Sequence, residues 1–248
     1  VIMSTYNGEK TLSRSINSIL NQTYSDFEFI ICNDGSTDNT LKLLNKYSRE
    51  DNRIKVIINK HNLGLQKSLN KCLKKSKGKY LARMDDDDVS NQNRFQIQVN
   101  YLNHHPEIAF VGSNVSLFDD KDGIYGQNIF IKNPTKYQLF RRDEFCHPSV
   151  MMRANIIKSV GGYSESKRFY RIEDHELWLR LYSLGYQGAN LQKNLLKYNV
   201  DIHSHKSKFY DYFDRFRLLL EYKKKFNIGF KGYIYILSSL LKIFCNGF

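Results

Sequence analysis

Four consecutive aspartates, Asp85 to Asp88, follow an apolar run in a chain whose formal net charge is +13. Four neighbouring carboxylates repel one another, and a cation at this point would offset that repulsion. Hard divalent cations such as Mg²⁺ and Mn²⁺ take carboxylate oxygens as ligands and complete their shell with water and substrate phosphate. The acidic run therefore predicts a metal ion that carries a diphosphate. The alternative is a solvated turn or the cap of the next helix.

Two other polar clusters also follow apolar segments. The first is Ser4-Thr5-Tyr6-Asn7, and the second is Asn33-Asp34-Gly35-Ser36. In open parallel sheets, ligands bind beyond the carboxyl ends of the strands. If both segments are strands of one such sheet, a single crevice would collect these two clusters and the acidic run.

The elements that must position these clusters alternate along the first half of the chain. Short apolar strands are expected in VIMSTYN, FEFIIC, IKVIINK and KYLARM. Helices are expected from Thr11 to Leu20, from a cap at Ser36 or Thr37 to Tyr47, and across NLGLQKSLNKCLKKSKG up to Gly78. This alternation predicts an α/β fold with a mostly parallel sheet, right-handed crossovers and flanking helices.

The pattern becomes mixed after residue 90. FVGSNVSLFD and YGQNIFIKN are expected to pair as strands, HPSVMMR is another strand-like stretch, and EDHELWLRLYSLG is a helix that Gly185 ends. From Lys206 onward, aromatic and leucine side chains recur at helical intervals. We expect a C-terminal helical segment over residues 206–248.

Composition limits the classes of protein that fit. The chain has 248 residues, enough for one large or two small domains, and contains 38 basic against 25 acidic residues. That excess favours a polyanionic partner: nucleic acid, an anionic membrane or a phosphorylated small molecule. The four cysteines have no zinc-site spacing, no signal peptide is recognised, and no apolar run reaches the ~20 residues that span a bilayer. We expect a reduced, cytoplasmic protein.

Taken in order, STYNGEKTL, ICNDGSTDNT, ARMDDDDV, HPSVMMR, GGY and EDHELWLRL resemble the family 2 glycosyltransferases of the GT-A fold, and most closely those of bacterial capsular polysaccharide and O-antigen synthesis. The resemblance covers roughly residues 1–200. It implies inverting transfer of a sugar from a nucleotide-activated donor, typically a UDP-sugar, with Mn²⁺ or Mg²⁺. It also implies a catalytic domain over 1–205, with a nucleotide-binding half of about 1–100 and an acceptor half of about 101–205.

The resemblance also assigns roles in donor binding. Ser4, Thr5 and Tyr6 correspond to positions that line the nucleotide, and Asp34 to the carboxylate that accepts a hydrogen bond from the base. The remaining nucleotide and metal positions fall in and after the acidic run, with Asp85 and Asp86 near the ribose, Asp87 on the metal, and His203 or His205 as a further metal ligand. The register of the acidic run stays open, because the family often has Ala or Ser at position 86.

On the acceptor side, Asp174 corresponds to the general base. Glu173, His147 and Trp178 fall in the region of the acceptor and donor sugar. Without the family context, Glu173 and Asp174 also suit the first turn of a helix, where the helix dipole favours negative charge. Trp178 also suits a core position.

Other functions fit these residues less well. A sugar-nucleotide pyrophosphorylase would need a glycine-rich basic loop after the first strand, and STYNGEKTL is a poor match. For a nucleic-acid-binding protein, the four aspartates would repel the backbone. No GxGxxG follows a strand, which excludes the common dinucleotide fingerprint.

The segment after residue 206 has two interpretations. It is either a helical hairpin packed on the catalytic domain or a contact with an anionic membrane. Membrane contact on the inner face would suit an acceptor carried by a polyprenyl diphosphate.

Overall fold

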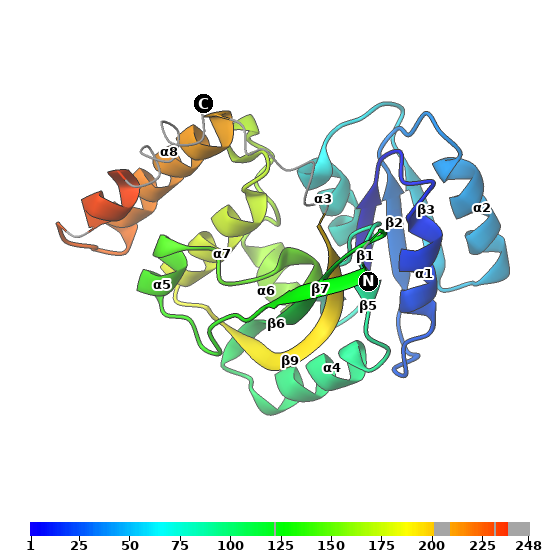
Figure 1. Cartoon of the computed structure of the whole chain (residues 1–248), viewed down its shortest axis with the longest axis horizontal. Helices are drawn as coiled ribbons and strands as arrows, with labels where there is room; N and C mark the ends of the chain where they lie inside the picture. The colour runs from blue at the N-terminus through cyan, green and yellow to red at the C-terminus, as the bar shows by residue number, and fades with distance from the viewer. Residues whose placement is uncertain (122, 201–208, 231, 238–248) are drawn as a thin grey trace.

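The first half of the chain is built from three βα units, seen in the right-hand lobe of Figure 1. The computed structural model describes residues 1–121, 123–200, 209–230 and 232–237. The three units are β1 (Ile2–Thr5) with α1 (Leu12–Leu20), β2 (Phe29–Asn33) with α2 (Thr40–Glu50), and β3 (Ile54–Ile58) with α3 (Leu65–Lys75). The predicted α/β architecture is therefore confirmed.

These three strands are parallel, in the order β1-β2-β3. Thr5 lies opposite Asn33, and Asn33 lies opposite Ile58. Strands β1 and β2 are buried along their whole length, as their uninterrupted apolar sequences indicate. Because the strands end level with one another, the polar residues that follow β1 and β2 emerge side by side.

The second half forms a mixed sheet in the order β4-β8-β6-β9-β5, with β7 paired to β6. Its strands are β4 (Tyr80–Ala82), β5 (Val89–Ser90), β6 (Ile108–Asp119), β7 (Gly123–Asn128), β8 (Met151–Arg153) and β9 (Gln187–Asn199). Its helices are α4 (Arg94–His104), α5 (Lys136–Arg141), α6 (Ala154–Ser159) and α7 (Glu173–Ser183), with 3₁₀ turns at His147–Ser149 and Lys167–Phe169. The expected pairing of β6 with β7 is confirmed.

The segment that leads into the acidic run joins the two sheets. Arg83 forms an isolated parallel bridge with Ile2. The Met84 N–H donates to the Ile2 carbonyl at 3.2 Å, and the Arg83 N–H donates to the Val150 carbonyl at 2.9 Å. The acidic run therefore starts beside the end of β1, at the centre of the combined sheet.

Two element boundaries differ from the sequence prediction. Helix α2 begins at Thr40, because the Thr40 N–H is bound by the Asp38 carboxylate at 3.0 Å rather than by a cap at Ser36 or Thr37. Helix α3 ends at Lys75, where Ser76 turns to an extended backbone before Gly78 is reached.

The described part of the C-terminal segment is mostly helical, as predicted, and packs on the second half of the fold. Helix α8 (Phe209–Lys225) contributes Leu218, Leu219 and Tyr222 to the core that holds Trp178. Within the described ranges, no helix combines the length and apolarity required to cross a bilayer. Helix α8 is therefore attached to the rest of the fold through apolar packing.

Candidate active site

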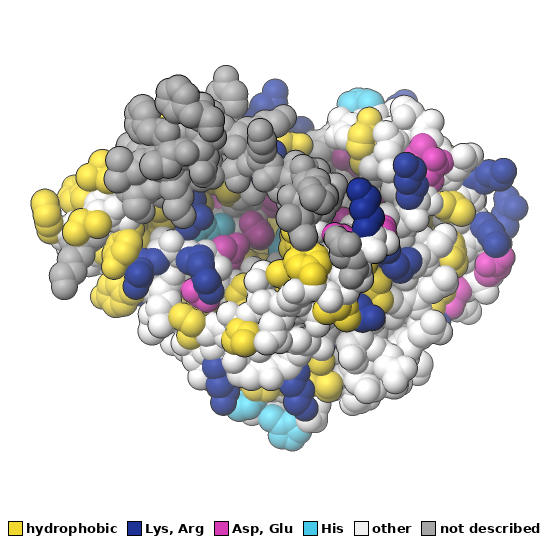
Figure 2. Space-filling model, viewed as in Figure 1, with side chains coloured by type: hydrophobic (Ala, Val, Ile, Leu, Met, Phe, Trp, Pro, Cys, Tyr) yellow, Lys and Arg dark blue, Asp and Glu magenta, His cyan; other side chains and the backbone are white. Residues whose placement is uncertain are grey.

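A cavity of about 300 Å³ collects all three polar clusters at the carboxyl ends of the strands. Its wall is formed by Ser4, Tyr6, Asp34, Asn62, Gly64, Leu65, Asp85, Asp86, Tyr170, Arg171 and Glu173. The convergence predicted from the strand ends is therefore observed. The opposite wall comes from the segment before α7 and from its first residue. Figure 2 shows acidic side chains in the hollow between the two lobes.

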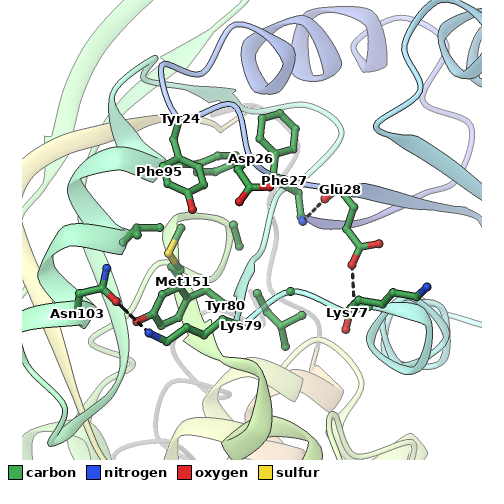
Figure 3. A pocket seen from close by; sticks show the side chains of 16 residues that line it. Tyr24, Asp26, Phe27, Glu28, Lys77, Lys79, Tyr80, Phe95, Asn103 and Met151 are labelled. Atoms are coloured by element: carbon green, nitrogen blue, oxygen red, sulfur yellow. Dashed lines mark hydrogen bonds between the residues drawn. The ribbon is translucent and has the colours of Figure 1, made fainter.

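A larger cavity of about 550 Å³ lies at the other edge of the sheet and is shown in Figure 3. It is lined by residues that precede β1, β2 and β4 or cover them, such as Tyr24, Asp26, Lys79 and Phe95. Its Glu28 carboxylate is already engaged by Lys55 at 2.6 Å and by the Lys77 N–H at 2.6 Å. Because none of the three polar clusters reaches this cavity, the smaller one is the candidate site.

Asp34 is buried directly after β2. Its Oδ1 accepts from Asn59 Nδ2 at 2.7 Å and from the Leu63 N–H at 2.8 Å, and its Oδ2 accepts from the Gly64 N–H at 2.9 Å. The Asp34 carboxylate thus fixes the loop that contains Leu63 and Gly64, which forms one side of the cavity. Asp34 itself also lines the cavity. A ligand there would meet both the carboxylate and the loop that it shapes.

The residues after β1 divide between the cavity and its support. Ser4 and Tyr6 line the cavity, and the Tyr6 ring is 47% exposed. Thr5 is buried, and its hydroxyl donates to Asp86 Oδ2. A side chain at Gly8 would place Cβ 2.5 Å from the same oxygen, so only glycine leaves room for this carboxylate. Thr5 therefore positions Asp86 rather than lining the cavity itself.

Three of the four clustered aspartates bring carboxylate oxygens together. One oxygen each from Asp85, Asp87 and Asp88 lies within 4.8 Å of the others, whereas Asp86 points to Thr5. Asp88 Oδ1 accepts from the Asn199 N–H at 2.8 Å, but its buried Oδ2 has no hydrogen-bond partner among the residues that the structure describes. A buried carboxylate oxygen without a partner, beside two others, suits a hard divalent cation.

The positive charge nearest to this cluster is Arg83, whose buried guanidinium pairs with Asp85. Burial raises the pKa of Asp86 to about 7 and that of Asp87 to about 6, and the charge of Asp85 adds to both shifts. Burial also raises the pKa of Asp88 well above its usual range. Arg83 therefore offsets only part of the repulsion, and the metal-free cluster holds protons near neutral pH.

Asp86→Asn should make the metal-free protein more stable at high pH. The folded state binds a proton at Asp86 up to about pH 7, whereas an unfolded aspartate loses it near 3.9, so this group lowers stability as pH rises from about 4 to about 7. We expect the free energy of unfolding in EDTA to rise by about 4 kcal/mol at pH 8 and little at pH 4. Urea unfolding of both proteins at the two pH values measures this. Asp26→Asn is the control, and an equal change in both variants contradicts the prediction.

Glu173 and Asp174 occupy the first turn of α7, where the helix dipole favours carboxylates. Glu173 lines the cavity and is buried, with Gln66 Nε2 at 3.4 Å from its Oε2. Asp174 is half-buried, and its Oδ1 accepts from the His175 N–H at 2.8 Å. Burial raises the pKa of Glu173 to about 7 and raises that of Asp174 as well. Carboxylates with raised pKa values are suited to accept a proton near neutral pH.

Two residues expected in the sugar-binding region lie in the core instead. Trp178 has no exposed surface and stacks on Phe110 with the ring centroids 4.5 Å apart. His147 is buried, and its Nε2 lies 2.8 Å from the Tyr163 hydroxyl. Neither lines the cavity, because the apolar faces of α7 and of the 3₁₀ turn at His147–Ser149 point into the sheet. His203 and His205 lie outside the described residues.

Sequence reasoning did not single out several residues of this site. The pattern analysis did not predict Arg83 as part of the site. An arginine two positions before an acidic run, after an apolar strand, nevertheless indicates a positive charge that pairs with the run. Asp88 and Asn199 are brought together by the pairing of β5 with β9. Asp143 lies close to Asp174, whose charge, together with burial, raises the Asp143 pKa well above its usual range. No local sequence pattern predicts that Asp88 meets Asn199 or that Asp143 lies close to Asp174.

The comparison with known proteins agrees with this geometry. EpsE of Bacillus subtilis (strain 168) is 38% identical over 246 residues, which cover 98% of this chain and 88% of EpsE. The Escherichia coli protein WfgD, named UDP-Glc:alpha-D-GlcNAc-diphosphoundecaprenol beta-1,3-glucosyltransferase, is 29% identical over 181 residues, 73% of this chain and 68% of WfgD.

Among solved structures, residues 1–349 of S. aureus TarS in complex with UDP-GlcNAc match with a TM-score of 0.73 and 20% identity, over 98% of this chain and 71% of that one. This likeness shows the fold. The sequence profile of glycosyl transferase family 2 matches residues 1–161. The chain therefore belongs to glycosyl transferase family 2.

Proposed function

We propose that the protein is a metal-assisted, inverting glycosyltransferase that moves a sugar from a UDP-sugar to a saccharide acceptor of surface polysaccharide synthesis. The observation that carries this is the cavity itself. Asp34 and the acidic run form one wall, and the carboxylate-bearing start of α7 forms the other. A donor seated on the first wall would present its sugar to an acceptor at the second.

The nucleotide would occupy the part of the cavity nearest to β1 and β2. Tyr6 offers an exposed ring for stacking, and Asp34 offers a carboxylate edge to a base N–H. A uracil base is supported by the UDP-GlcNAc bound to the structural neighbour TarS and by the UDP-Glc in the name of WfgD.

Asp85, Asp87 and Asp88 would hold Mn²⁺ or Mg²⁺. A bound divalent ion supplies Lewis-acid stabilisation of the negative charge that develops on the departing nucleoside diphosphate. Asn199 positions Asp88 through its backbone N–H, and Arg83 orients Asp85. Asp87, the metal ligand expected from the sequence, would thus share the ion with Asp85 and Asp88.

Asp174 would act as the general base. Its half-buried side chain has one oxygen that does not accept from the His175 N–H, whereas Glu173, which lines the cavity, is buried and faces Gln66. An acceptor hydroxyl within hydrogen-bond reach of Asp174 would lose its proton to it as the new glycosidic bond forms. One base and one leaving-group site are sufficient for a direct displacement with inversion.

The acceptor that we propose is a saccharide carried on a polyprenyl diphosphate. WfgD, by its name, acts on a diphosphoundecaprenol-linked sugar. Such an acceptor would place the enzyme in the cytoplasm, at the inner face of the membrane. The family assignment leaves no observation in favour of a pyrophosphorylase or a nucleic-acid-binding protein.

A thermal-shift panel tests the donor and the metal together. UDP-, GDP- and dTDP-sugars are each added with Mn²⁺ or with EDTA. We expect stabilisation by the UDP-sugars only, and only with metal, because the diphosphate is held through the ion. Stabilisation by GDP-sugars instead would overturn the choice of base, and equal stabilisation in EDTA would overturn the metal.

A further inference from the structure

An exposed apolar surface lies beyond α8, within the described residues 230 and 232–237. Phe230 is 82% exposed and Ile234 is 58% exposed, and Tyr233 and Leu237 are exposed as well. Residues 232–237 are helical, so Tyr233, Ile234 and Leu237 share one face, while Ile236 on the other face is buried in the core. The buried side attaches this helix to the protein, and the opposite apolar side is left to solvent. We call the four exposed residues the C-terminal apolar face.

Lysines border this face. Lys223 and Lys224 lie in the last turn of α8 and line a shallow cavity of about 330 Å³ together with Tyr233. The Lys223 ammonium lies 4.1 Å from the centroid of the Tyr233 ring, which places positive charge directly at the edge of the apolar side chains. In Figure 2 this end of the molecule, at the far left, shows exposed hydrophobic side chains. Aromatic and aliphatic side chains edged by lysines are the composition of an interfacial membrane contact.

Helix α8 packs against α7, the helix whose first residue, Glu173, lines the cavity. The Tyr222 hydroxyl donates to Glu176 of α7 at 3.1 Å, and Arg168, in the 3₁₀ turn before α7, lies 3.9 Å from Glu221. Leu218 and Leu219 are buried in the core that α7 shares. The apolar face thus follows α8, the helix that packs against α7, and α7 carries Glu173 and Asp174.

We propose that the C-terminal apolar face and its flanking lysines bind the surface of an anionic lipid bilayer. The charge of the chain favours an anionic bilayer over a protein partner, because the net charge is +13 and lysines adjoin the apolar side chains. The lysines would contact lipid phosphates while the apolar side chains contact acyl chains. The proposal deepens the proposed function, because it would hold the active site at the bilayer that contains a lipid-linked acceptor.

The test is co-sedimentation of the full chain with vesicles, in the absence of donor and acceptor. We expect binding to phosphatidylglycerol–phosphatidylcholine vesicles at low salt, and weak binding to pure phosphatidylcholine. Each of Lys223→Ala and Lys224→Ala should weaken binding about fivefold, because a lysine at the surface contributes about 1 kcal/mol. Phe230→Ser with Ile234→Ser should weaken it at least tenfold. The matched control is Ile129→Ser. Ile129 is 59% exposed, as Ile234 is to a similar degree, but it follows β7 and is about a hundred residues before the C-terminal apolar face in the sequence.

Equal loss of binding in Ile129→Ser, or equal binding to both kinds of vesicle, would overturn the proposal. So would a stable dimer in solution that Ile234→Ser dissociates, since the face would then be an interface between two copies. Because no substrate is present, failure here leaves the glycosyltransferase assignment standing. Failure of the donor panel above, in turn, leaves vesicle binding unaffected.

Discussion

Asp174→Asn is expected to lower turnover by about 10²–10⁴-fold while leaving the affinity for the donor unchanged. The amide keeps the shape of the side chain and its acceptance of the His175 N–H, but it cannot take a proton from the acceptor hydroxyl. Donor affinity is set on the other wall of the cavity, at Asp34 and the acidic run. Calorimetric titration with the UDP-sugar and release of UDP in the presence of acceptor measure the two quantities separately.

The neighbouring glutamate offers a matched comparison. Glu173→Gln alters a carboxylate in the same helical turn, but one that is buried and faces Gln66. We expect a smaller loss of turnover from it than from Asp174→Asn. The reverse order would transfer the role of base to Glu173. Asp26→Asn, in the wall of the second cavity, should change neither turnover nor donor affinity.

Asp87→Asn is expected to weaken Mn²⁺ binding by about 100-fold or more, since even residues that only orient metal ligands are worth 10–100-fold. The variant removes one of three carboxylates whose oxygens converge. Electron paramagnetic resonance of free Mn²⁺ reports binding directly, without substrate. Loss of the metal should lower turnover in parallel, because the leaving diphosphate would no longer be stabilised.

Asp86→Asn is the control within the same run of residues. Its carboxylate is directed to the Thr5 hydroxyl rather than to the other three aspartates. Mn²⁺ affinity should therefore change little in this variant. If Asp86→Asn loses the metal and Asp87→Asn keeps it, the register of the site is shifted by one residue. If both variants keep full affinity, the ion is not held by this cluster.

Local sequence was sufficient for the three βα units at the start of the fold. Uninterrupted apolar runs such as Ile2–Thr5 and Phe29–Asn33 require burial on both faces, and the intervening amphipathic helices supply it. The parallel order then places Asp34 and the acidic run at one edge. The existence of a polar crevice follows from these local patterns and a general rule of parallel sheets.

The mixed sheet depended on long-range pairing. Strand β9 (Gln187–Asn199) was not predicted, because its sequence mixes apolar and polar residues without strict alternation. It is stabilised as a strand by β6 on one side, with partners some eighty positions away in the sequence, such as Val115 and Leu196. Helix α4 (Arg94–His104) was missed as well, and its weakly amphipathic pattern is explained by the buried polar side chains of Arg94 and Gln98.

The amino-acid sequence by itself determined the family, the sheet edge at which the polar clusters meet, and the types of residue available there. Only the tertiary structure decided which carboxylates meet. Asp86 turns to Thr5 while Asp88, held by Asn199, turns to Asp85 and Asp87, and Trp178 faces the core rather than the cavity. The physical reason is that the direction of a side chain depends on partners that distant strands supply, and those partners are not encoded in the neighbouring residues.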